Sequence, residues 1–129
     1  MKIAIDTANA RPVYEQIVQR VEQAILSGEL APGKPLPPIR QLANDLELNP
    51  NTVARAYQQL GRNQIVATAG RRGTFVDPDA LEHLVEKTQR EAQRRLSGVV
   101  RELREQGQSD HAIRALFKVA MNRANPGGK

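Results

Sequence analysis

A cluster of prolines just after residue 30 is the feature that most restricts how this chain can fold. Residues 30–38 contain Pro32, Pro35, Pro37 and Pro38. Proline lacks a backbone N–H and fixes φ, so this density excludes a helix interior and imposes an ordered turn. The helical patterns on either side of the cluster therefore belong to separate helices.

Three segments around the proline cluster have the apolar spacing of helices. Apolar residues recur there at intervals of three and four, which predicts helices at 12–27, 39–46 and 50–60. The apolar positions are Tyr14, Ile17, Val18, Val21, Ile25 and Leu26 in the first helix, Ile39, Leu42, Ala43 and Leu46 in the second, and Val53, Ala56, Tyr57 and Leu60 in the third.

The second and third of these helices are predicted to form a helix-turn-helix. Asn49 is a suitable N-cap for the third helix, and Pro50 is a suitable first residue. The two helices are short and joined by a tight turn, and the later one presents a polar and basic face. That face consists of Asn51, Ala54, Arg55, Gln58 and Arg62.

A β-hairpin is predicted directly after the helix-turn-helix. Two short β-type runs, 65–68 and 74–76, flank a basic loop. Gly70 and Gly73 allow the positive φ that a tight turn needs. This hairpin would form the wing of a winged helix.

The C-terminal part of the chain is predicted to be helical. Asp77 and Pro78 suit the start of a long helix, Gly98 within it marks a kink or a close crossing, and Ser109 suits the N-cap of a last short helix. Residues 1–6 alternate in polarity like a short strand, and residues 125–129 resemble a frayed tail.

An apolar stripe along these C-terminal helices has two interpretations. It could cover the wing domain within one subunit, or it could pair with a second chain. Residues 1–76 form too small a domain to cover both sides of so long a helix, which favours a dimer interface. The predicted dimerisation residues are Leu81, Leu84, Val85, Leu96, Val99, Val100, Leu103, Leu116 and Phe117.

The predicted fold class is therefore mainly α with a small β-hairpin. Residues 1–76 would form an N-terminal winged helix-turn-helix that binds DNA. Residues 77–124 would form a short helical dimerisation region, and residues 125–129 a flexible tail.

The charge distribution favours a polyanionic partner. The formal net charge is +5, and residues 49–76 contain four arginines and no Asp or Glu. Carboxylates on a phosphate-facing surface would repel nucleic acid, so a basic stretch without acids suits such a surface, although a chance cluster on a solvated face remains the alternative. Aromatic residues make up 3% of the chain, too few for stacking single-stranded bases, which favours duplex DNA.

Other functional classes find little support. The chain has no cysteine, no apolar run long enough to span a bilayer and no signal-peptide pattern, so we expect a cytoplasmic location, no membrane association and no disulfides. His83 and His111 lie in no nucleophile motif, and the basic loop does not resemble a P-loop, so neither an enzyme nor a cofactor is expected. Asp79, Glu82, His83 and Glu86 are better explained as a solvated first helical turn than as a metal site.

Several motifs in order resemble the GntR family of bacterial regulators over about half of the chain. The short helical C-terminus resembles the YtrA-type subfamily. The resemblance implies a winged-helix dimer that recognises a pseudo-palindromic operator, often to repress a nearby transporter operon. The matching motifs are Pro12–Ile17, Gly28–Leu30, Pro32–Gly33, Leu36–Pro37, Arg40–Ala43, Asn49–Tyr57 and Gly70–Val76.

Three positions depart from the family pattern. Pro38 stands where a small residue such as Ser is usual, which removes a phosphate contact but is compatible with a first helical turn. Ala54 stands where many relatives have Arg, and the basic residue here is the next one, Arg55. Gln64 stands where Gly is usual, so it requires a left-handed backbone or a different turn.

The candidate DNA-binding residues lie on the third helix, the second helix and the wing. Asn51 and Arg55 are four residues apart and point the same way, and their side chains suit adenine and guanine respectively. Arg40 matches a DNA-contacting arginine of the family. The full set is Arg40, Asn49, Asn51, Thr52, Arg55, Gln58, Arg71, Arg72 and Gly73.

Three functions are compatible with this site. The first is a dimeric repressor that binds a palindromic operator in double-stranded DNA. The others are a non-specific architectural DNA-binding protein and a winged helix used only for protein contacts. No motif identifies the operator, the regulated genes or a small-molecule effector.

Overall fold

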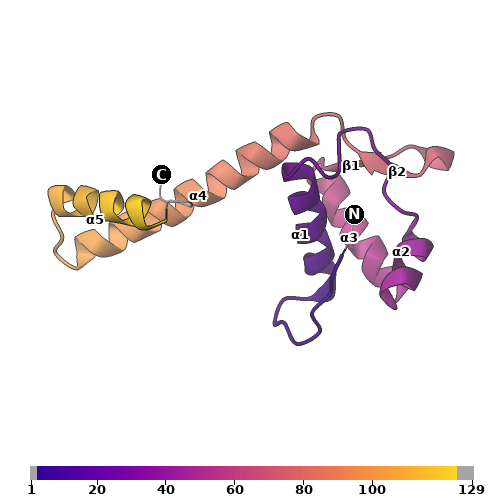
Figure 1. Cartoon of the computed structure of the whole chain (residues 1–129), viewed down its shortest axis with the longest axis horizontal. Helices are drawn as coiled ribbons and strands as arrows, with labels where there is room; N and C mark the ends of the chain where they lie inside the picture. Colours follow the sequence, from indigo (N-terminus) through magenta and orange to yellow (C-terminus); the bar gives the residue numbers. More distant parts are fainter. Residues whose placement is uncertain (1–2, 125–129) are drawn as a thin grey trace. The chain divides into compact units, whose positions relative to one another are not determined.

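The computed structural model describes residues 3–124, which divide into two compact units between Lys87 and Thr88 (Figure 1). Within these residues the chain forms five α-helices and one two-stranded antiparallel hairpin, which confirms the predicted fold class. In chain order the elements are α1 (Val13–Leu26), α2 (Ile39–Leu46), α3 (Pro50–Arg62), β1 (Val66–Thr68), a 3-10 turn (Gly70–Arg72), β2 (Thr74–Val76), α4 (Ala80–Glu105) and α5 (Asp110–Arg123).

The core of the first unit forms where α1 and α3 lie side by side, with α2 packed on α3 (Figure 1). The predicted apolar positions at three- and four-residue spacing supply most of this core. Removing these side chains from water is the main force that holds the three helices together. The fully buried members include Ile17, Val21, Val53, Leu60 and Ile65.

The proline-rich segment lies against the hairpin. β1 and β2 pair with Val66 opposite Val76. The Leu36 N–H donates to the Thr74 carbonyl (2.8 Å), and the Val76 N–H donates to the Lys34 carbonyl (2.8 Å). Proline suits this outer position because an edge segment leaves some of its N–H groups unused. The segment therefore connects the wing to the start of α2.

Two helices end in left-handed residues that are not glycine. Gln64 has a φ of 62°, which confirms the left-handed backbone, one of the two alternatives predicted for it. Glu47 has a φ of 56° in the turn between α2 and α3. After each of them the next N–H reaches back into the helix: Leu48 donates to the Ala43 carbonyl, and Ile65 to the Leu60 carbonyl. This pattern satisfies carbonyls at the helix end and turns the chain sharply.

Three local predictions differ from the structure. No strand forms in residues 3–6; residues 1–2, like the predicted tail at 125–129, lie outside the described part of the chain. α4 begins at Ala80, because Asp77 Oδ1 accepts the Asp79 N–H (2.8 Å) and forms a turn before the helix. Gly98 lies inside one uninterrupted helix, and no heavy atom of a neighbouring element lies within 4 Å of where its Cβ would stand, so it does not mark a close crossing.

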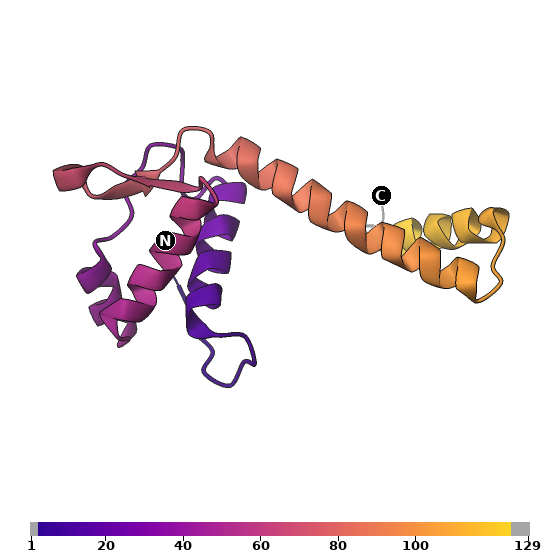
Figure 2. The ribbon, with the colours of Figure 1, turned by 180° about the vertical axis from the view of Figure 1, so that it is seen from behind.

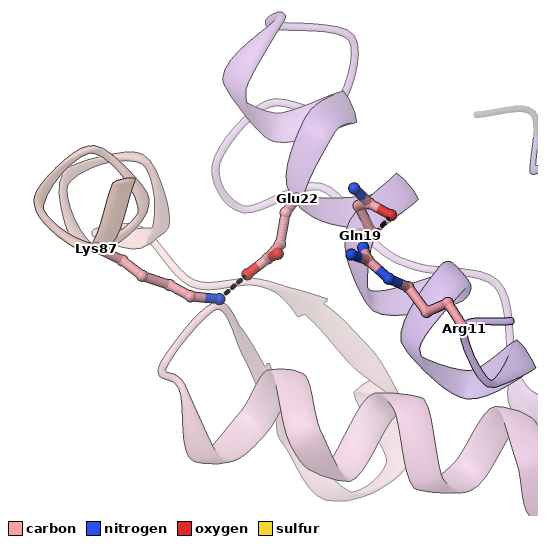
Figure 3. Close-up of polar contacts among 4 residues, drawn as sticks. All are labelled: Arg11, Gln19, Glu22 and Lys87. Carbon is pink, nitrogen blue, oxygen red and sulfur yellow. Dashed lines mark hydrogen bonds and ion pairs between the residues drawn. The ribbon is translucent and has the colours of Figure 1, made fainter. Parts of the chain in front are cut away.

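The start of α4 belongs to the N-terminal unit. Ala80 and Leu84 are buried in its core, and Lys87 Nζ forms an ion pair with Glu22 Oε2 of α1 (2.8 Å; Figure 3). The N-terminal unit therefore extends past residue 76, the predicted boundary, to Lys87.

The N-terminal segment before α1 is held by a buried amide. Gln16 Oε1 accepts the Asp6 N–H (2.9 Å), and Gln16 Nε2 donates to the carbonyls of Asp6 and Arg11 (3.0 Å each). Arg11 also donates to Gln19 Oε1 (2.7 Å; Figure 3). These bonds replace the water that the buried side chain of Gln16 has lost.

The second unit is a helical hairpin, in which α5 turns back along the C-terminal part of α4 (Figure 2). Gly107 ends α4 with a φ of 89°, and the Ser109 side chain caps α5 by accepting the Ala112 N–H (3.1 Å), as predicted. Arg104 Nε donates to Asp110 Oδ1 (3.1 Å) across the turn. None of the described helices has the length and apolar character needed to cross a membrane.

Candidate nucleic-acid interface

One face of α3 is buried and the opposite face is exposed. Val53, Ala56, Tyr57 and Leu60 pack into the core, so the helix presents its other side to solvent. Of the predicted contacts on α3, Asn51, Arg55 and Gln58 are exposed and Thr52 is half-buried.

Asn49 caps α3. Its Oδ1 accepts the Asn51 N–H (2.8 Å), which satisfies one of the free donors at the start of the helix. Pro50 follows as the first helical residue, as predicted. The cap fixes the end of α3 that adjoins the turn of the helix-turn-helix.

Tyr57 holds α3 against the proline-rich segment. Its hydroxyl donates to the Pro37 carbonyl (2.7 Å). Burial raises the pKa of the Tyr57 phenol to about 12, because the phenolate would be poorly solvated there. The predicted role of Tyr57 in the core is therefore confirmed, and its hydroxyl adds a link that the apolar pattern could not indicate.

A polar hollow runs along the exposed face of α3. The guanidinium carbon of Arg55 lies 4.0 Å from the centroid of the Tyr14 ring, which comes from α1. The DNA-binding residues predicted from the sequence do not include Tyr14, Gln59 or Arg62. Arg62 could have been selected, because it continues the spacing of Asn51, Arg55 and Gln58, whereas a contact between α1 and α3 leaves no local signal. The hollow is lined by Tyr14, Asn51, Ala54, Arg55, Gln58, Gln59 and Arg62.

Arg40 is exposed on the first turn of α2. It lines a second hollow, which also includes Asn44, Leu48 and Pro50 around the turn of the helix-turn-helix. Pro38, which stands where the family usually has a small residue, leaves α2 intact, because the helix begins at the next residue, Ile39. Arg40 is thus presented next to the start of α3.

The tip of the wing presents two arginines. Arg71 and Arg72 are exposed in the 3-10 turn between β1 and β2. The turn is closed by the Ala69 N–H, which donates to the Gly73 carbonyl (3.0 Å). Gly70 and Gly73 have φ values of 52° and 81°, which confirms that the turn uses their freedom to adopt positive φ.

The candidate arginines are available to an anionic ligand. Within residues 3–124, no ion pair engages Arg40, Arg55, Arg71 or Arg72. Guanidinium groups bind phosphates and guanine edges through their N–H donors, which a carboxylate partner would otherwise occupy. This part of the surface can therefore bind a polyanion without first breaking an ion pair.

A different group of polar side chains lies at the start of α4, in the turn before the helix and in its first turn. Asp77, Asp79 and His83 each place a ligand atom within 4.8 Å of the others. Of the four residues considered from the sequence, this group includes Asp79 and His83. The Asp77 carboxylate already accepts the Asp79 N–H (2.8 Å), which is the role of a turn that caps a helix.

The predicted dimerisation residues differ in how the structure covers them. Leu81, Val85, Leu96, Val99 and Leu116 are exposed, whereas Val100, Leu103 and Phe117 are half-buried. Leu84 is only 2% exposed in the core of its own unit and so offers no surface to a partner. Val119 and Met121 are exposed apolar residues that are not among the predicted dimerisation residues.

Comparison with known proteins places this architecture in a family. Residues 13–76 match bacterial regulatory proteins of the gntR family. The HTH-type transcriptional repressor YtrA of Bacillus subtilis is 43% identical over 84 residues, which are 65% of this chain and 65% of that repressor. The match thus spans slightly less than two thirds of the length of this relative.

Solved structures extend the similarity over more of the chain. A transcriptional regulator from Oenococcus oeni has a TM-score of 0.76 at 29% identity, covering 92% of this chain and 98% of its own. YtrA from Sulfolobus acidocaldarius, a GntR-family transcription factor, has a TM-score of 0.57 at 32% identity, covering 71% of this chain and 97% of its own. These relatives are transcriptional regulators, in agreement with the prediction that this chain is not an enzyme. The chain belongs to the GntR family of bacterial transcriptional regulators.

Proposed function

We propose that this chain represses transcription by binding a palindromic operator in double-stranded DNA as a homodimer. The observation that carries the proposal is the exposed face of α3 beside an arginine-tipped wing. Residues 49–76, which include both elements, contain no acidic residue that would repel a phosphate backbone.

In this proposal α3 enters the major groove and reads base edges. Arg55 donates in bidentate fashion to a guanine, and Asn51 and Gln58 are suited to adenine. The N-cap bond occupies Asn49 Oδ1, so Asn49 contacts a phosphate through its amide NH₂ group, and Thr52 supports the same end of α3. Arg40 binds a phosphate from α2.

The wing contributes contacts that do not depend on sequence. Arg71 and Arg72 reach phosphates or the minor groove, and Gly73 lets the backbone approach closely because it has no side chain. Such contacts set the affinity for any duplex, whereas the α3 contacts set the preference for an operator.

The dimer in this proposal covers apolar side chains that each unit leaves exposed. In the described part of the second unit only Ile113 is buried, while Leu96, Val99, Leu116, Val119 and Met121 are 43–75% exposed. Soluble monomers rarely expose clustered apolar surface, so a second copy is the natural cover. Leu81 and Val85 of the first unit join the proposed interface, and the half-buried Val100, Leu103 and Phe117 support it from within the hairpin.

Selection from random duplexes tests the DNA-binding part of this proposal. The purified protein is mixed with a library of about 20 randomised base pairs, and the retained duplexes are sequenced. We expect two inverted half-sites about one helical turn, ~34 Å, apart. If the retained duplexes shared no sequence, the protein would instead be an architectural DNA-binding protein. If the protein retained no duplex in a salt-sensitive way, it would be a protein-interaction module.

A gel shift with the intergenic DNA next to the gene tests the regulatory part. We expect that DNA to contain the selected operator and to lie beside a transporter operon, as the family resemblance implies. Screening the transported solutes for release of the complex tests effector control. An operator found only inside unrelated coding sequences would contradict the repressor proposal.

A further inference from the structure

We infer that Tyr14 of α1 is a positioning residue for Arg55, and that their stacking sets how sharply α3 discriminates between base pairs. The inference rests on the proposed function, because it concerns how Arg55 meets a DNA base. It is based on one contact: the Arg55 guanidinium carbon lies over the Tyr14 ring, 4.0 Å from its centroid. At that distance the cation is attracted to the negative face of the ring.

The ring is itself held in place. Tyr14 lies in the first turn of α1, is half-buried and packs against the hydrophobic core. Its hydroxyl donates weakly to Glu15 Oε1 on the same helix (3.3 Å). α1 and α3 pack against each other, so the ring is a fixed platform beside the exposed face of α3.

Contact with a ring leaves the guanidinium donors available. A carboxylate partner would bind those N–H groups, but among residues 3–124 no carboxylate forms an ion pair with Arg55. Bidentate recognition of guanine needs two parallel N–H donors in the plane of the guanidinium. Tyr14 therefore restrains the cation and consumes none of the hydrogen bonds that reading a base requires.

This restraint has a measurable consequence. A free arginine side chain loses rotamer freedom when it binds, whereas one already ordered on a ring loses less. Removing the ring should weaken operator binding about 3- to 10-fold and leave random duplex almost unaffected, because only the operator engages the ordered guanidinium.

A double-mutant cycle tests the inference with the operator recovered by selection as the probe. The proteins are the wild type, Tyr14→Leu, Tyr14→Phe, Arg55→Ala and the double variant Tyr14→Leu/Arg55→Ala. We expect Tyr14→Leu to lose affinity, Tyr14→Phe to remain within about 2-fold of wild type because it keeps the ring, and Tyr14→Leu to have no further effect once Arg55 is alanine.

The outcomes separate positioning from a merely structural role. Urea denaturation of each protein tests whether it is folded. If Tyr14→Leu is unfolded, Tyr14→Met takes its place. Wild-type affinity in the Leu variant, or an equal loss in the Arg55→Ala background, would overturn the inference while leaving the proposed function intact. If the wild-type protein selects no duplex, the proposed function fails first and the inference fails with it.

Discussion

The hydroxyl of Tyr57 donates a 2.7 Å hydrogen bond to the backbone carbonyl of Pro37. Tyr57 belongs to α3, and Pro37 lies two residues before the start of α2. One bond therefore joins the candidate recognition helix to the segment that leads into its partner in the helix-turn-helix. The proline-rich segment is in turn bonded to β2 of the wing, so the three candidate DNA-contacting elements share a common support.

Tyr57→Phe should destabilise the protein by about 1–2 kcal/mol, because it leaves the part-buried carbonyl of Pro37 without its donor. The measurement is the free energy of unfolding in urea. Tyr14→Phe is the matched control, since it removes a hydroxyl whose bond is longer, at 3.3 Å, from a residue that is half-buried, whereas Tyr57 is buried. Equal losses in the two variants would contradict the importance assigned to the link between Tyr57 and Pro37.

Stability at alkaline pH should depend on Tyr57. Burial raises the pKa of its phenol from 10.0 to about 12, so the unfolded chain ionises before the folded one. The stability that the protonated Tyr57 contributes is therefore fully present below pH 10 and is lost as the pH rises through the pKa of the folded state. Between about pH 10 and 12 we expect the wild type to lose up to about 2–3 kcal/mol more than Tyr57→Phe. Parallel stability curves for the two proteins would contradict this account.

Asn49 allows helix capping to be separated from DNA binding. Asn49→Ala removes the acceptor of the Asn51 N–H and should cost about 1 kcal/mol of stability. Asn49→Asp keeps an acceptor at the positive end of α3 and should be as stable as the wild type. The aspartate also places a negative charge in the acid-free stretch, so it should weaken duplex binding at least about 5-fold. An aspartate variant with both properties unchanged would remove Asn49 from the proposed interface.

Local pattern was sufficient to predict most of the fold. The spacing of residues such as Ile17, Val21, Val53 and Leu60 indicates which face of each helix is buried, and those positions form the core. Asn49 and Ser109 were predicted to cap helices, and the structure confirms both, because capping depends only on neighbouring backbone groups. Pro12 was predicted as the first residue of its helix, but it is the extended residue just before α1.

Features that depend on contacts between distant residues were not predictable in this way. Tyr14 and Arg55 are 41 positions apart, so no local signal joins them. Leu84 belongs to the apolar stripe of α4, yet packing within the first unit buries it and removes it from the predicted dimer surface. The left-handed turn at Glu47 was likewise not predictable, since its residue type does not favour positive φ.

The proposed dimer should dissociate when a charge is placed in its apolar surface. Leu96→Glu puts a carboxylate at a side chain that is 49% exposed in the single chain. Two-fold symmetry repeats the change in both subunits, so the dimer should weaken by at least about 2 kcal/mol, as measured by sedimentation equilibrium.

Arg94→Gln is the matched control for Leu96→Glu. It changes the charge by the same amount from the opposite side of α4, because two residues correspond to about 200° of helix rotation. The proposed interface would be contradicted if both variants weakened the dimer by the same amount, or if the wild type were monomeric.

The most direct test of the account compares Arg55→Ala and Arg72→Ala on two duplexes, the selected operator and a random sequence, between about 50 and 200 mM salt. Arg55→Ala should cost about 1–3 kcal/mol on the operator and little on the random duplex, because it removes a base contact. Arg72→Ala should weaken both duplexes by the same factor and reduce the salt slope by about one for each arginine lost. If both variants bound both duplexes like the wild type, α3 and the wing would not be the DNA-binding surface of this protein.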